Sequence, residues 1–163
     1  MEEKLWEVIS LETFGLGAKE RSWENYADPH EQALNAFCAK VRRNLMAQFK
    51  ACGDTVEVAV DFEIQTISIG EFEVVLDTNR KTGKISGITL EQRITGGPRP
   101  DDTGMRFGAN VLPVTVVRDY EEPDVWVRYV TLPWNRELDN SNAYDTAFQL
   151  NKLYHKAEYL WGS

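Results

Sequence analysis

The chain has 163 residues and a mass of 18.7 kDa, a length that suits one domain. Hydrophobic residues make up 42% and charged residues 27%, so the chain can bury a core and is not disordered by composition. The net charge is −8, which argues against a general binder of nucleic acid or of an anionic membrane, because both surfaces are themselves negative.

Localisation and cofactors are constrained by what the sequence lacks. No apolar stretch approaches the ~20 residues of a membrane helix, and the start Met1-Glu2-Glu3 has neither the basic nor the apolar region of a signal peptide. We therefore expect a cytoplasmic protein. Cys38 and Cys52 are expected to be reduced and unbridged. Asp101-Asp102 is a candidate cation ligand, but adjacent aspartates are also common in plain turns, so we predict no cofactor and no metal site.

The first clear element is a helix over about residues 29–52. Asp28 is a good N-cap, and Pro29 occupies the first helical position, where its missing N–H costs nothing. Gly53 supplies the stop. Apolar side chains recur at helical spacing and predict one buried face, made of Leu34, Phe37, Cys38, Val41, Leu45, Phe49 and Cys52.

Strands follow the helix. Alternating apolar residues over 56–62 and 72–76 predict half-buried strands. Ile67 and Ile69 continue the first run in the opposite phase, so we expect a turn or a bulge near Gln65-Thr66. The return strand, about 85–94, changes phase at Gly87, which indicates a bulge.

Residues 95–110 interrupt the pattern with four glycines and two prolines, and we expect a long flexible loop there. Two further strands are predicted, at about 111–118 and 125–132.

The chain ends in a predicted helix over about 143–161, capped by Ser141 or Asn142. An apolar stripe and a neighbouring aromatic row make this helix apolar over a wide arc. At the other end of the chain, residues 5–11 are expected to form a strand rather than a helix, followed by a turn at residues 15–17.

These elements predict a single α+β domain over residues 1–163. An antiparallel sheet of about six to seven strands packs against the long helix and the C-terminal helix. The element order resembles the helix-grip arrangement, in which a curved sheet wraps the last helix and leaves a cavity. A two-layer sandwich with both helices on one face of the sheet is the alternative.

The candidate ligand-binding residues come from the aromatic helix face, the last strands and the loop. Tryptophan and tyrosine supply much contact area with few rotatable bonds, and arginine binds anions. The set is Arg106, Arg128, Tyr129, Trp134, Tyr144, Phe148 and His155. No catalytic residue is predicted, because the phosphate-loop, nucleophile-elbow and zinc-protease motifs are absent, and a histidine on an aromatic face more often packs than catalyses.

Three function classes remain open. The first is a non-catalytic acidic protein-binding module, such as an inhibitor, immunity-type protein or adaptor, whose partner is another protein. The second binds a small, partly apolar ligand between the sheet and the last helix, with residues 95–110 as a lid. The third is an enzyme of unrecognised type.

Overall fold

The computed structural model describes residues 28–162. The strand expected at residues 5–11 and the turn expected at residues 15–17 lie outside the described residues. The elements, in chain order, are α3 (Pro29–Ala51), β1 (Val58–Asp61), β2 (Thr66–Ile69), β3 (Phe72–Asn79), β4 (Lys84–Thr95), β5 (Met105–Phe107), β6 (Asn110–Leu112), β7 (Val114–Arg118), β8 (Val125–Arg136) and α4 (Asn140–Trp161).

Helix α3 begins and ends where its sequence predicts. The Asp28 carboxylate accepts a hydrogen bond from the Glu31 backbone N–H at 2.8 Å, which satisfies one of the free donors of the first turn. Gly53 follows the helix with φ +79°, a conformation that glycine adopts without strain. The predicted face is buried at Leu34, Phe37, Cys38, Val41, Leu45 and Phe49, whereas Cys52 is exposed.

Six strands form one antiparallel sheet in the order β1-β2-β3-β4-β8-β7, and β5 pairs with β6 in a separate hairpin. This confirms the predicted antiparallel α+β fold. The predicted bulge is also present, since the β4–β8 register shifts between Ile85 and Gly87. A Cβ added at Gly87 would lie 3.1 Å from Cγ2 of Thr131, so the tight approach of β8 favours glycine there.

Three predicted boundaries are wrong. The expected loop over residues 95–110 is shorter, because Met105–Phe107 forms β5 and Asn110 begins β6. The strand predicted at 111–118 is interrupted at Pro113, which has no N–H to give to a ladder. Helix α4 starts at Asn140 and is capped by Asp139, not by Ser141 or Asn142, since the Asp139 carboxylate accepts from the Asn142 N–H.

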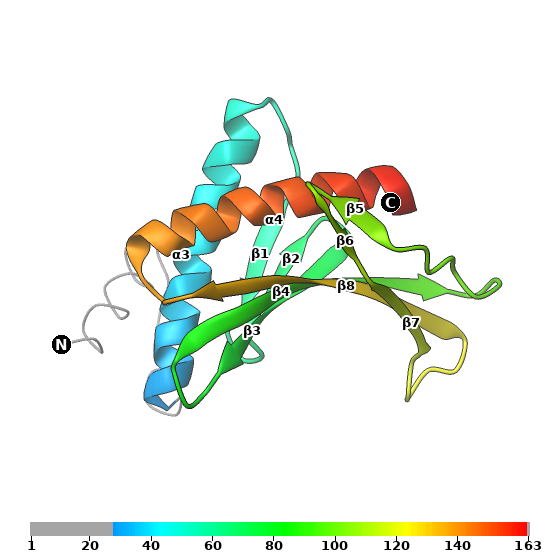
Figure 1. Ribbon diagram of the computed structural model, residues 1–163, viewed down its shortest axis with the longest axis horizontal. Helices are drawn as coiled ribbons and strands as arrows, with labels where there is room; N and C mark the ends of the chain where they lie inside the picture. Colours follow the sequence, from blue (N-terminus) through cyan, green and yellow to red (C-terminus); the bar gives the residue numbers. More distant parts are fainter. Residues whose placement is uncertain (1–27, 163) are drawn as a thin grey trace.

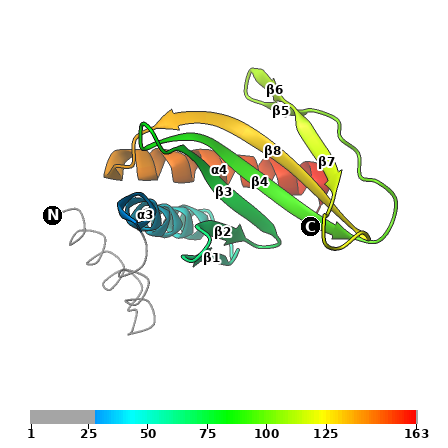
Figure 2. The ribbon, with the colours of Figure 1, turned by 90° about the horizontal axis from the view of Figure 1, so that it is seen from below.

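The sheet curves around α4, which lies across its concave face, as the helix-grip resemblance predicted (Figures 1 and 2). Helix α3 lies on the same side of the sheet, crosses α4 and packs beside β1 and β2. The concave face and both helices share one core, with Phe49, Phe72, Leu90 and Leu150 among its largest fully buried side chains. Neither described helix covers the convex face (Figure 2).

Within residues 28–162, neither helix combines the length and the apolar character needed to cross a membrane.

Candidate functional site

Helix α4 presents two different faces. The inner face of α4, toward α3 and the sheet, is fully buried and rich in small side chains: Ala143, Ala147, Leu150, Leu153 and Ala157 are all 0% exposed. The opposite face exposes large side chains, with Tyr144 at 53%, Phe148 at 46% and Tyr159 at 84%. The aromatic row predicted from sequence therefore faces away from the sheet.

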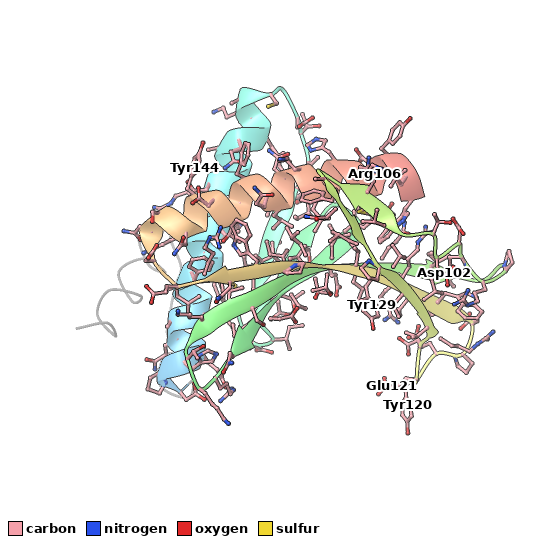
Figure 3. The ribbon with its side chains drawn as sticks, viewed as in Figure 1. Asp102, Arg106, Tyr120, Glu121, Tyr129 and Tyr144 are labelled. Atoms are coloured by element: carbon pink, nitrogen blue, oxygen red, sulfur yellow. The ribbon has the colours of Figure 1, made fainter. Side chains whose placement is uncertain are left out.

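The β5–β6 hairpin extends this outer face. The Lys152 ammonium lies 5.5 Å from the ring centroid of Phe148 and 5.8 Å from that of Phe107 on β5, so one cation bridges the two elements. Arg106, next to Phe107, is exposed and lies on the same side of α4 as Tyr144 (Figure 3). We call Tyr144, Phe148, Lys152 and Phe107 the α4 surface.

Both ring nitrogens of His155 face an acceptor, and a neutral ring, which carries one N–H, donates to one of them at a time. Its Nε2 lies 3.2 Å from the Asp54 carboxylate, and its Nδ1 lies 2.9 Å from the Asn151 carbonyl oxygen. The ring also packs against Phe49, with 5.7 Å between centroids. A catalytic histidine needs one nitrogen for its substrate or nucleophile. His155 instead fastens α4 to the segment after α3, which supports packing rather than catalysis.

Asp54 is the partner that sequence reasoning missed. It lies 101 residues from His155 in the chain, and only the turn at Gly53 brings it to α4. Its position directly after the predicted helix stop was the one available signal.

Arg128 and Trp134 lie on the concave face of β8, beneath or beside α4. Arg128 is 8% exposed, donates to the Gln92 side-chain oxygen at 2.9 Å and to the Asp101 carbonyl at 3.1 Å, and lies 4.6 Å from the Trp161 ring centroid. Trp134 is half-buried and donates to the Thr146 hydroxyl on α4 at 2.8 Å. Both side chains tie the sheet to neighbouring segments.

Tyr129 lies on the convex side of the sheet, away from α4 (Figure 3). It pairs in register with Glu91, and the adjacent pair Leu90–Val130 faces the core. The seven predicted residues thus occupy three places: the outer side of α4 and the hairpin, the buried concave face, and the convex face. The structure does not bring them into one pocket.

A cavity of about 670 Å³ opens at a place that no sequence pattern indicated, between the C-terminal half of α3 and β1. Its lining combines apolar side chains with charged ones, among them Arg42 and Lys50 from the helix and Asp54 and Glu57 from the strand side. The apolar lining comes from Met46, Ala47, Phe49, Val56, Val58 and Ala59.

The shifted titratable groups do not assemble a reactive centre. Burial raises the pKa of the Cys38 thiol to about 12. Burial, and then the bond to Glu158, raise the pKa of Tyr154 to about 12. Both groups stay protonated at neutral pH and are therefore poor nucleophiles or bases. Within the part of the chain that the structure describes, no three His, Cys, Asp or Glu side chains are grouped to hold a metal ion.

No protein-family model, curated protein or solved structure matches the chain.

Proposed function

We propose that the chain is a non-catalytic protein-binding module that engages its partner through the α4 surface. The observation that carries this proposal is the two-sided character of α4: its inner face is fully buried, yet aromatic side chains are exposed on its outer face. Contiguous exposed aromatic residues rimmed by polar ones are typical of protein interfaces.

The α4 surface has the composition of such an interface. Tyr144 and Phe148 are one helical turn apart, so their rings follow one line along the helix. Lys152 and Phe107 continue that line toward the hairpin. Burial of these rings by a partner removes apolar area from water, which is the main favourable term in protein association.

The other two classes have less support. A ligand held between the sheet and α4 needs open space there, but the inner face of α4, Tyr154 included, is packed into the hydrophobic core. An enzyme needs a reactive group that is free to meet a substrate, but both nitrogens of His155 face acceptors of the chain itself. The acidic balance of the chain remains consistent with an inhibitor, immunity-type or adaptor role in the cytoplasm.

The test compares the amount of each protein captured by the wild-type chain with the amount captured by a variant. The wild-type chain and the double variant Tyr144→Ser/Phe148→Ser are used as baits in a lysate of the source cells, and bound proteins are quantified by mass spectrometry. Val75→Ser is the matched control, because Val75 is also exposed, at 38%, but lies on the convex face.

We expect at least one protein to be enriched with the wild type and with Val75→Ser, and to fall at least tenfold with the double variant. Equal recovery of every captured protein with the double variant contradicts a partner site on α4. Recovery of a small molecule in place of a protein supports the ligand-binding class instead.

A further inference from the structure

Strand β1 is an edge of the six-stranded sheet, and no other strand of the described residues pairs with its outer side (Figure 2). The Gly70 N–H donates to the Glu57 carbonyl at 3.0 Å, so the carbonyl of Glu57 faces β2. In an antiparallel ladder the facing direction alternates along the strand, so the N–H and C=O groups of Val58 and Val60 face outward. The Arg42 side chain occupies one of these groups, the Val58 carbonyl, at 2.9 Å.

The cavity between α3 and β1 lies directly beside this edge. Val58 and Ala59 line it on the strand side, and Met46 and Phe49 line it on the helix side. Met46 is 41% exposed, and methionine adapts its shape to different apolar partners. An extended segment that pairs with β1 would place alternate side chains toward α3, and its apolar side chains would enter the cavity there.

The charges around β1 indicate what such a segment carries on its other face. Residues 54–63 contain four acidic side chains and no base. Val58 is buried in the core, so the alternate residues Glu57, Ala59 and Asp61 point to the convex face of the sheet. Glu57 and Asp61 are both exposed there. In the cavity lining, by contrast, Arg42 and Lys50 from the helix offset Asp54 and Glu57. Cationic side chains therefore fit the convex face beside Glu57 and Asp61, and apolar side chains fit the apolar part of the cavity.

We propose that the β1 edge is a strand-addition site for an extended segment of a partner protein in which basic and apolar residues alternate. The segment pairs its backbone with the Val58 N–H and with Val60, since Arg42 holds the Val58 carbonyl. It places lysine or arginine beside Glu57 and Asp61, and seats an apolar side chain against Met46. This site is distinct from the α4 surface and does not depend on it.

A second copy of this chain does not satisfy the same edge. Two β1 strands pairing antiparallel would bring the acidic side chains of residues 54–63 against each other, and like charges facing across a strand pair are destabilising. The occupant is therefore a basic segment of a different chain.

The test uses the full chain and a fluorescent ten-residue peptide of alternating lysine and valine, with binding measured by anisotropy at 0.15 M salt. Val60→Pro removes an outward N–H and leaves the bonds to β2 in place. Val60→Ala is the matched control, because it shortens the same side chain and keeps the N–H. A second peptide has the same composition with its lysines and valines in two blocks. A third is the alternating peptide with its β1-facing amides N-methylated.

We expect the alternating peptide to bind the wild type and Val60→Ala with affinities within threefold of each other, and Val60→Pro at least tenfold more weakly. The N-methylated peptide should lose binding to the wild type by a similar factor, a result that does not depend on how Val60→Pro folds. Equal binding of the alternating and block peptides would overturn the proposal, because it would show attraction to the acidic surface alone. A dimer in sedimentation that Val60→Pro dissociates would also overturn it, in favour of self-pairing.

Discussion

Arg128 is a buried cation whose hydrogen bonds go to neutral acceptors, while the Asp101 carboxylate acts on its charge from a distance. Its guanidinium donates to the Gln92 side chain and to a loop carbonyl, while its Nε is buried without a hydrogen-bond partner. Burial lowers the pKa of Arg128, although an arginine side chain still keeps its proton. The hydrogen bond from Arg128 to Gln92 should therefore contribute more to stability than a neutral one.

Gln92→Ala should lower the free energy of unfolding by about 2 kcal/mol, because it removes an acceptor from a buried charged donor. Gln92→Glu should unfold within ~1 kcal/mol of the wild type at pH 7, since it restores an acceptor of similar length and adds the missing negative charge. Urea unfolding measures both. A Gln92→Ala loss below ~0.5 kcal/mol would show that the network does not stabilise the fold.

The two thiols should react at different rates. Cys52 is exposed, whereas Cys38 is buried on α3 and its pKa is raised to about 12, so Cys38 has little thiolate to react at neutral pH. An aromatic disulfide reagent should titrate one thiol rapidly in the native protein and two in urea. Two rapid thiols in the native state would contradict the burial of Cys38, and none in urea would contradict the absence of a bridge.

At the scale of elements, α3 is held by its buried face. Leu45→Ala should cost about 2–5 kcal/mol in urea unfolding, because Leu45 is 0% exposed and its loss leaves a cavity between helix and sheet. The neighbouring Met46→Ala is the matched control on the same helix and should cost less than ~1 kcal/mol, since Met46 is 41% exposed. Similar losses for both variants would contradict the assignment of the buried face.

The elements that were predicted well are those whose ends and buried face are encoded by neighbouring residues. Helix α3 has a cap, a proline at its first position, a periodic face and a glycine stop, and its bounds were predicted within one residue. The β5–β6 hairpin was missed because each strand has only three residues, too few for an alternating pattern, and glycines and prolines flank them. Its pairing depends on the buried contacts of Met105 and Leu112, which are long-range and leave no periodic signal.

The candidate site was harder to predict than the fold, for a geometric reason. A wide apolar arc on α4 shows that the helix has more apolar surface than one contact needs, but it does not say which part of the arc faces the sheet. The alanines at 143, 147 and 157 set that orientation by allowing close packing, and they turn Tyr144 and Phe148 outward. The sequence of β8 likewise does not say which of its alternating side chains face α4. That is set by the pairing of β8 with β4 and β7.

The whole molecule distributes its charge by layer. Helix α3 carries four bases and one acid, whereas residues 53–79, which include β1, β2 and β3, carry seven acids and no base. The two proposed surfaces therefore differ in kind: the α4 surface is aromatic and bridged by a lysine, and the β1 edge is acidic. A partner that occupies one of them is not expected to compete for the other.

The α4 surface is tested most directly by hydroxyl-radical footprinting of the wild-type chain, with and without the protein captured through α4. Mass spectrometry then gives the oxidation rate of each aromatic side chain. Tyr144 and Phe148 should be protected severalfold in the complex. Tyr120, which is 99% exposed on the β7–β8 turn far from α4, is the internal control and should keep its rate (Figure 3). Protection of Tyr120 or Tyr129 with unchanged rates at Tyr144 and Phe148 would place the partner elsewhere and contradict the account.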